Sequence, residues 1–205
     1  IYAMDFSRAI DHAAKTLRDV GNAHCVQADI CHLPFRDQTF DFTYCLGVLH
    51  HLKDPDQGMA SVNRVTRIQG ALLVYLYYAL DNRPAVHRWL LAGATGVRRV
   101  TSRLPKRVMF SVAWAIGIGL YWPLARAARV MEMAGMNRAA LQMPLAHYRS
   151  YSLSFMAGDA FDRFATPIEK RYSRADIAAW LAKYGRDVNF SDHTPYWVTL
   201  ARTRG

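Results

Sequence analysis

The chain has little cysteine: three among 205 residues, at Cys25, Cys31 and Cys45. Three cysteines are too few for a disulfide framework, and no CxxC pair with a histidine at finger spacing indicates a structural zinc site. Residues 1–20 carry charges throughout and lack the apolar stretch of a signal peptide. We therefore expect reduced thiols, no bound metal and a cytoplasmic protein, either free or associated with a membrane.

Acidic residues are scarce in the middle of the chain. Residues 83–149 contain 11 basic side chains and a single acidic one, Glu132, and so carry a net charge of +10. Residues 1–82 sum to −2 and residues 150–205 to +2, so this segment holds the whole imbalance. Such a basic surface attracts the phosphates of nucleic acid or of anionic lipid. The alternative is a solvated arginine-rich surface without a dedicated partner.

Only one long stretch lacks charge, at residues 108–125, and basic residues flank it on both sides. Its 18 residues are at the lower limit for a membrane span. Gly117, Gly119 and Pro123 weaken a straight helix, and positive charge at both ends gives no orientation. Three alternatives stay open: a lid over an apolar pocket, a helix lying on a membrane, and a span.

Strands and helices alternate in the two outer parts of the chain. Apolar and β-branched runs predict strands at 1–5, 24–27, 40–46 and 71–78. Helical spacing and capping residues predict helices at 7–20, 55–66 and 173–184. We expect the run at 71–78 to be buried on both faces. This alternation predicts an α/β fold with a parallel sheet and crossover helices.

Two final strands, at 188–192 and 196–202, predict an antiparallel hairpin that closes the sheet, with its turn at His193–Pro195. The segment 81–160 interrupts the alternation with helical, arginine-rich and apolar stretches. We therefore expect one core formed by residues 1–80 and 161–205, with residues 81–160 inserted as a helical, cationic and hydrophobic cap or membrane contact.

Acidic or small residues follow three of the predicted strands. Asp5 closes the first strand, Asp29 follows the second, and Leu46–Gly47 closes the third, just before His50–His51. Ligands of open α/β sheets bind beyond the carboxyl ends of the strands. Carboxylates there can accept hydrogen bonds from ribose hydroxyls or an adenine amino group, and a small residue lets a ligand approach the backbone. Together these residues indicate a nucleoside ligand.

Residues 28–78, which begin ADICHLPF and contain CLGVLHHLKDP, resemble the class I S-adenosylmethionine-dependent methyltransferases. The similarity is greatest to the type 11 group, which includes quinone-biosynthesis C-methyltransferases. IYAMDFS at 1–7 is similar to the family's second strand, and RYSRADIAAWLAKYG at 171–185 to its last helix. The resemblance covers about 1–80 and 168–205 and implies a Rossmann-like methyltransferase sheet.

The resemblance also implies roles for individual residues, with S-adenosylmethionine as the cofactor. Asp5 would hold the ribose hydroxyls beside Phe6, and Asp29 the adenine amino group beside Ile30. Leu46 and Gly47 would line the methionine end of the cofactor. His51, at the mouth of the pocket, is the candidate catalytic base. The candidate substrate-binding residues are Tyr77, Tyr78, His147, Tyr148 and Arg149.

Structural alternatives accompany several of these roles. His50 and His51 could simply cap the turn before Leu52. The cluster at 147–152 could pack the insertion against the sheet, and His147 is a second candidate base.

Two departures from the family pattern stand out. The family begins with a strand and a GxGxG turn, which this sequence does not contain. We therefore expect an N-terminally truncated core, with the first strand and helix missing and a gap between the strands at 1–5 and 40–46. The family's Pro-Gly-Gly turn is IQG at 68–70 here, which we expect to alter only a turn.

The predicted function is methyl transfer to a small, apolar or lipid-linked molecule, with contact to an anionic membrane through residues 83–149. One alternative is a non-catalytic, membrane-associated remnant of the methyltransferase fold. A nucleic-acid methyltransferase is disfavoured, because the basic segment is also the apolar one. The oligomeric state is left open.

Overall fold

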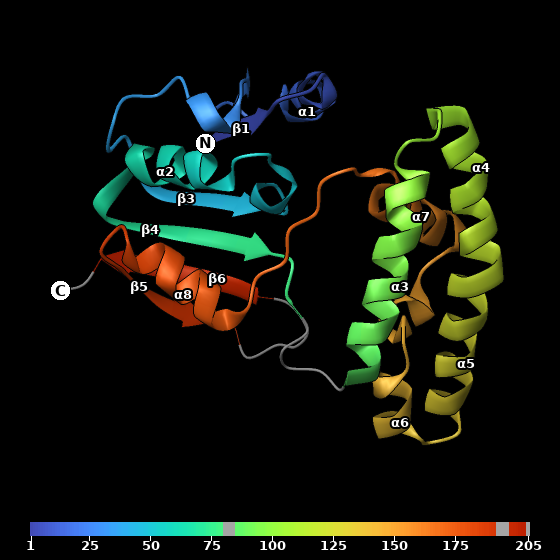
Figure 1. The fold of residues 1–205 in the computed structure, drawn as a ribbon. Coiled ribbons are helices and arrows are strands. Elements are labelled where there is room, and N and C mark those ends of the chain that lie inside the picture. The colour runs from blue at the N-terminus through green and yellow to red at the C-terminus, as the bar shows by residue number, and fades with distance from the viewer. Residues whose placement is uncertain (80–84, 192–196, 204–205) are drawn as a thin grey trace. The chain divides into compact units, whose positions relative to one another are not determined.

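The structure is a computed structural model that describes residues 1–79, 85–191 and 197–203 (Figure 1). The chain divides into two compact units. Unit 1 comprises residues 1–82 and 168–205, and unit 2 comprises residues 83–167. We expected the insertion to end at 160, but its last helix, α7 (Leu153–Ala165), continues beyond that residue. The described cysteines of unit 1 are all free.

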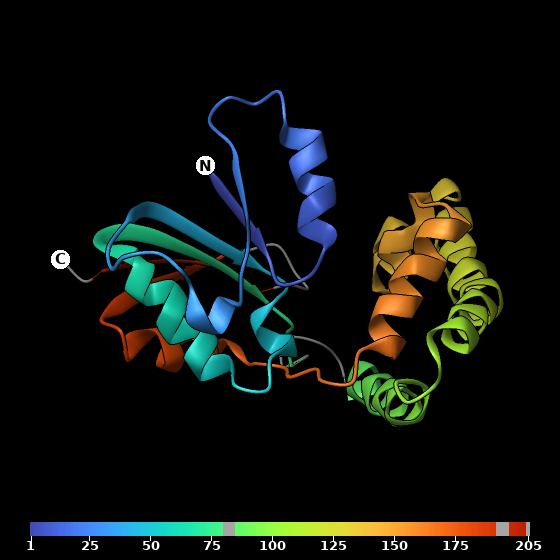
Figure 2. The same ribbon diagram turned by 90° about the horizontal axis from the view of Figure 1, so that it is seen from above.

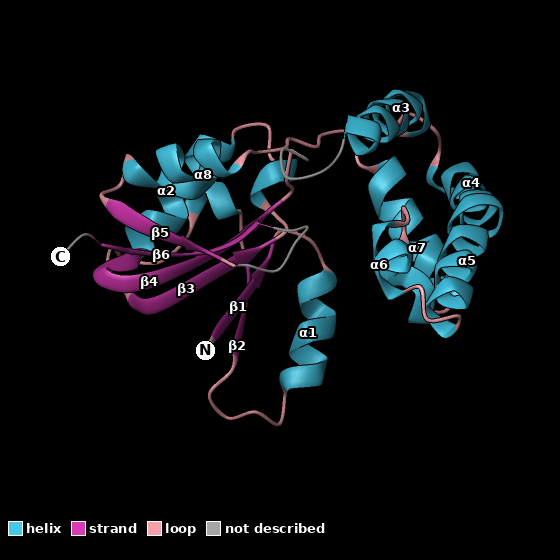
Figure 3. Cartoon of the chain, turned by 90° about the horizontal axis from the view of Figure 1, so that it is seen from below, coloured by secondary structure: helices cyan, strands magenta, loops and turns pink. Residues whose placement is uncertain are grey.

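Unit 1 contains two sheets (Figure 3). In the first, β1 (Tyr2–Asp5) pairs in parallel with β2 (His24–Gln27). The second has four strands in the order β3-β4-β6-β5. These are β3 (Phe40–Leu46), β4 (Thr66–Leu76), β6 (Trp197–Thr203) and β5 (Arg186–Phe190). Within the described ranges β1 and β3 do not pair with each other.

The strand directions agree with the sequence prediction. β3 runs parallel to β4, and β6 runs antiparallel to both β4 and β5. The predicted terminal strand pair is thus confirmed, while its turn at His193–Pro195 lies outside the described residues.

The helices α2 (Pro55–Val65) and α8 (Arg174–Ala182) cover one face of the four-stranded sheet (Figures 2 and 3). Leu72, Val74 and Leu76 of β4 are fully buried in the core on this side. On β3, by contrast, Phe42 and Tyr44 are about half exposed. On β4 itself, Ala71, Leu73 and Tyr75 alternate with the buried residues and are only partly buried. The expectation that the run at 71–78 is buried on both faces was therefore wrong, since helices of the described chain cover only one face.

Local capping explains where these helices begin. Asp54 accepts a hydrogen bond from the Gln57 amide at 3.0 Å and caps α2. Ser173 and Asp176 form a reciprocal capping box at α8, as predicted for a helix starting there. The first helix, α1 (Ala9–Leu17), is shorter than the expected 7–20. Ser7 lies one residue before the N-cap position Arg8, and its hydroxyl accepts a hydrogen bond from the Ala9 amide at 3.1 Å and donates one to Asp5. Ser7 therefore caps the first turn, as the sequence predicts.

The IQG segment at 68–70 lies within β4 and not in a turn, which corrects the sequence prediction. Gly70 faces the register shift between Phe40 and Phe42 of the neighbouring strand. A Cβ atom on Gly70 would lie 2.8 Å from the carbonyl oxygen of Asp41. A glycine is therefore required because two backbones approach closely at this irregularity.

Unit 2 is helical. Its helices are α3 (Ala85–Thr101), α4 (Lys106–Ile116), the π-helical turn η3 (Gly117–Tyr121), α5 (Trp122–Met133), α6 (Asn137–Gln142) and α7. Its core includes Met109, Tyr121, Tyr148 and Met156. By length and composition the continuous helix Lys106–Met133 could cross a membrane, and 28% of its apolar window is buried inside the protein.

Candidate active site

The carboxyl ends of β1 and β2 lie side by side, because Asp5 pairs with Gln27 and the Ala28 amide donates to the Asp5 carbonyl at 3.1 Å. The amide and hydroxyl of Ser7 both donate to Oδ1 of Asp5 at 2.7 Å. Oδ2 of Asp5 has no hydrogen-bond partner in the described part of the chain. The strand end thus presents a carboxylate oriented by local hydrogen bonds, with one oxygen available to a ligand.

Asp29 is held in the same way just after β2. Its Oδ1 accepts from the Cys31 amide at 2.9 Å, while Oδ2 lies 3.6 Å from Nδ1 of His32. The hydrogen bond from the Cys31 amide, followed by contributions from His32, lowers the pKa of the Asp29 carboxyl. The group is therefore ionised at neutral pH and is an acceptor only.

The two apolar neighbours of these carboxylates differ in exposure. Phe6 is 74% exposed, so its ring is available to a ligand. Ile30 is 8% exposed and packs in the core of unit 1. Little of the Ile30 side chain is available for the adenine contact that the resemblance implies.

Gly47 follows β3 with φ of +76°, and its amide donates to the Tyr75 carbonyl at 3.2 Å. Glycine adopts this left-handed conformation without the steric cost that a Cβ atom brings. The preceding Leu46 is half exposed. The end of β3 therefore offers bare backbone next to an accessible apolar side chain.

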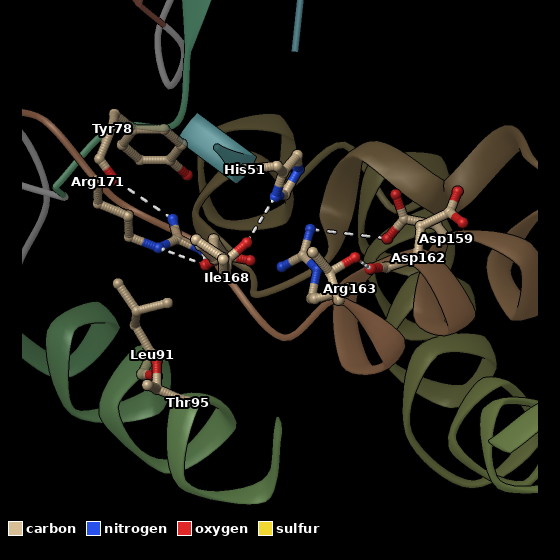
Figure 4. A network of polar contacts seen from close by, with 11 residues as sticks. His51, Tyr78, Leu91, Thr95, Asp159, Asp162, Arg163, Ile168 and Arg171 are labelled. Atoms are coloured by element: carbon tan, nitrogen blue, oxygen red, sulfur yellow. Dashed lines mark hydrogen bonds and ion pairs between the residues drawn. The ribbon is translucent and has the colours of Figure 1, made fainter. Parts of the chain in front are cut away.

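His51 belongs to the short 3-10 helix η2 (Leu49–His51), and its Nδ1 lies 2.8 Å from the carbonyl oxygen of Ile168 (Figure 4). A carbonyl oxygen only accepts, so Nδ1 carries the proton. In the neutral ring Nε2 then keeps its lone pair and is an acceptor. The partner is 117 residues away, and backbone bonds close the turn itself. His51 thus does not cap the turn, and the hydrogen bond to Ile168 fixes the orientation of its ring.

His50 is fully buried, and neither of its ring nitrogens has a hydrogen-bond partner in the described ranges. Its ring stacks on Tyr77 with centroids 3.9 Å apart. Burial, and next the nearby charges of His51 and Arg171, lower the pKa of His50 to about 3. His50 is therefore a neutral packing residue beneath His51 and does not cap the turn.

This burial makes the protein sensitive to acid. The unfolded chain, with a histidine pKa of about 6.5, binds more protons than the folded chain between that pH and about 3. Between about pH 6.5 and about pH 5, we expect the wild-type protein to lose up to about 2 kcal/mol more unfolding free energy than His50→Phe. Urea denaturation of both proteins at the two pH values measures this difference, and His12→Phe, at an exposed histidine of α1, is the control. Identical pH dependence in wild type and His50→Phe would contradict it.

A segment that sequence reasoning missed borders these histidines. The Lys170 amide donates to the His50 carbonyl at 2.8 Å, and the Tyr172 amide to the Tyr77 carbonyl at 2.9 Å. Arg171 pairs with the nearly buried Glu169 at 2.6 Å, and its guanidinium lies 5.3 Å from the Tyr77 ring centroid. It also donates to the Tyr78 carbonyl at 3.3 Å (Figure 4). Tyr77 is thus held between His50 and Arg171.

The other predicted substrate residues, His147, Tyr148 and Arg149, lie in unit 2. The Tyr148 hydroxyl donates to the Asp159 carboxylate, and burial raises the pKa of Tyr148 above its usual range. Arg149 pairs with Glu132 at 2.8 Å. The polar groups of Tyr148 and Arg149 are thus engaged by other residues of unit 2.

The described residues contain no group of three or more histidine, cysteine, aspartate or glutamate side chains able to hold a metal ion. Burial raises the pKa of the Cys45 thiol to about 11, so it stays protonated. Asp5, Asp29, Gly47 and His51 are predicted site residues that lie at or just after the ends of β1, β2 and β3.

Residues 1–74 match the family described as "Methyltransferase domain". A ubiquinone/menaquinone biosynthesis C-methyltransferase of Haemophilus ducreyi is 42% identical over 60 residues, which are 29% of this chain and 23% of that protein. A demethylmenaquinone methyltransferase of Thermobifida fusca is 37% identical over 59 residues, 29% of this chain and 25% of that protein. The chain thus spans about a quarter of the length of these curated relatives.

The fold of this chain is similar to that of a chain in a solved structure, the complex between the Haloferax volcanii Trm112 methyltransferase activator and a methyltransferase. The similarity has a TM-score of 0.51 at 11% identity and covers 100% of this chain and 72% of that one. At this identity the likeness concerns the fold alone, and it agrees with a Rossmann-like methyltransferase sheet.

Proposed function

We propose that this chain, whose residues 1–74 carry the core of a class I S-adenosylmethionine-dependent methyltransferase, transfers a methyl group from that cofactor to a small, apolar or lipid-linked acceptor. The observation that carries the proposal is the pair of carboxylates at the adjacent ends of β1 and β2, next to the family match. The proposal concerns the whole protein. The curated relatives are much longer than the segment that this chain matches.

The residues at the strand ends fit the cofactor. Asp5 keeps one carboxylate oxygen available for ribose hydroxyls, and Asp29 is ionised and able to accept from an amino group. Gly47 leaves the backbone at the end of β3 uncovered by a side chain. When bound, S-adenosylmethionine supplies an electrophilic methyl group on a positively charged sulfur.

His51 acts on the acceptor. The Ile168 carbonyl fixes the proton on Nδ1, so Nε2 can take a proton from an acceptor that is a weak acid. His50 stays neutral, so it adds no positive charge beside His51. Tyr77, supported by His50 and Arg171, forms a rigid wall of the same region.

The acceptor class follows from apolar surface and from the relatives. Phe42, Tyr44 and Leu46 of β3 are about half exposed, and Leu46 lies next to Gly47. The names of both curated relatives refer to quinone biosynthesis or quinone methylation. A small apolar or lipid-linked molecule is therefore the substrate class that we propose. The proposal includes a cytoplasmic location and contact with an anionic membrane through residues 83–149.

Replacing Asp5 with Ala tests the cofactor assignment. We expect binding of S-adenosylmethionine to weaken by about 1–3 kcal/mol, because a polar group of the ligand loses its partner. Calorimetric titration measures the change. Asp11→Ala is the matched control, since this carboxylate is on α1 and pairs with Arg8 at 3.0 Å. An unchanged dissociation constant for Asp5→Ala, or an equal loss for Asp11→Ala, would overturn the assignment.

A further inference from the structure

One side of the continuous helix Lys106–Met133 is buried in the core of unit 2. Met109, Ala113, Tyr121 and Ala125, together with Gly117, recur every four residues and are buried. In a regular α-helix, positions four apart drift by about 40° at each step. The wider π-helical turn η3 takes up part of this drift and keeps these residues on one side.

This buried side packs against α7. A Cβ atom on Gly117 would lie 3.4 Å from Cα and Cβ of Ala157, so the two helices are in close contact there. Met156 and Ala160 of α7 belong to the same core. Asp159 and Arg163, also on α7, form an ion pair at 3.6 Å. A helix crossing a bilayer would have to separate from these charged neighbours or take them into hydrocarbon, which is costly.

Much of the helix surface outside this buried side is apolar and accessible. Six large apolar side chains are between 45% and 79% exposed: Val108, Ile118, Leu120, Trp122, Val130 and Met133. Phe110 is also exposed but borders α7, because its ring centroid lies 6.5 Å from that of Phe161. Several follow at helical spacing, as in Ile118, Trp122 and Val130. We call the six residues other than Phe110 the outer face. An apolar surface of this extent on a soluble unit usually marks an interaction site.

The charges around the outer face select an anionic partner. Lys106 and Arg107 at the start of the helix are exposed and have no ion pair in the described part of the chain. Arg126 places its guanidinium 5.9 Å from the Trp122 ring centroid, so positive charge lies beside the apolar surface. The only acidic residue between 83 and 149, Glu132, is engaged by Arg149. Phosphate headgroups above an apolar interior complement this combination.

We propose that the helix Lys106–Met133 lies flat in the interface of an anionic membrane, with the outer face inserted among the lipids and α7 on the side away from them. The inference rests on the membrane contact of the proposed function and is independent of methyl transfer. It gives that contact a defined face and excludes a span.

The test is sedimentation of the full chain with phosphatidylcholine vesicles that contain about one third phosphatidylglycerol. We expect the double variant Ile118→Ser/Trp122→Ser to bind at least about tenfold more weakly than wild type, because two inserted side chains are lost. We expect Ile68→Ser to bind like wild type, since Ile68 lies on β4 and is 59% exposed, close to the 55% of Ile118. Circular dichroism verifies that each variant is folded.

The salt dependence of vesicle binding and the insertion depth of the helix distinguish a surface helix from a span and from binding by charge alone. Between about 50 and about 500 mM salt, wild-type binding should fall without vanishing, because the apolar contribution is not screened. Fluorescent probes at positions 108, 118 and 130 should report one shallow depth. No vesicle binding by wild type would overturn the membrane contact itself. Equal binding by wild type and the double variant would overturn the outer face, and a probe at 118 much deeper than the other two would mean a span. Binding abolished by salt would indicate charge alone, as for a nucleic-acid surface.

Discussion

Substituting Arg186 with Met is expected to lower the free energy of unfolding of unit 1 by about 3–5 kcal/mol. Arg186 is 3% exposed and is the first residue of β5. Its guanidinium donates to Oδ1 of Asn63 at 2.6 Å and to the carbonyls of Gly70 at 2.9 Å and Arg67 at 3.3 Å. Methionine fills a similar volume but leaves these buried acceptors without a donor, which causes the loss.

Urea denaturation at neutral pH measures the effect, with Arg202→Met as the control because Arg202 is exposed on β6. Arg186→Lys should lie between the two, since an ammonium keeps the charge but cannot serve three divergent acceptors as the guanidinium fork does. A midpoint for Arg186→Met equal to that of Arg202→Met would show that these hydrogen bonds do not stabilise the fold.

The sequence predicted those elements whose limits depend on residues close by in the chain. Short-range signals were sufficient for α2 and α8, because Asp54 and Ser173 bind amides only three residues away. The strand at 40–46 was predicted with its exact limits from its apolar and aromatic residues. The early start of β4 at Thr66 was not predicted, since Thr66 pairs with Phe40 and residues 67–70 lie opposite the register shift between Phe40 and Phe42. Such pairing depends on a distant strand and has no local pattern.

The candidate site likewise contains residues that the sequence predicted and residues that it did not. The strand-end rule placed Asp5 and Asp29 next to each other, because parallel strands bring their carboxyl ends to one edge. Nothing near His51 in the sequence predicts Ile168 or Arg171, which reach the histidines through the return of the chain after unit 2. Glu169, Lys170 and Arg171 are consecutive charged residues, a pattern typical of a solvated surface. In the structure Glu169 and Arg171 are instead largely buried and paired.

His51→Asn is expected to lower kcat for methyl transfer by about 100- to 1,000-fold while leaving binding of S-adenosylmethionine unchanged. An asparagine amide can still donate to the Ile168 carbonyl, 2.8 Å from Nδ1 of His51, but it offers no basic nitrogen where Nε2 lies. The substitution therefore removes the base and retains the local hydrogen bond. Incorporation of labelled methyl groups into small apolar acceptors, measured as a function of pH, gives the rates.

The pH profile distinguishes a base from a structural residue. A rate that depends on a base falls on acidification, and His51→Asn should lose that dependence if His51 is the base. Imidazole added to His51→Gly should restore part of the rate, which a packing role does not predict. His12→Asn is the control, because His12 is exposed on α1 and lies away from the ends of β1, β2 and β3. Rates within about threefold of wild type for His51→Asn would mean that the acceptor reacts without a base, and that His51 orients the chain at Ile168 but moves no proton.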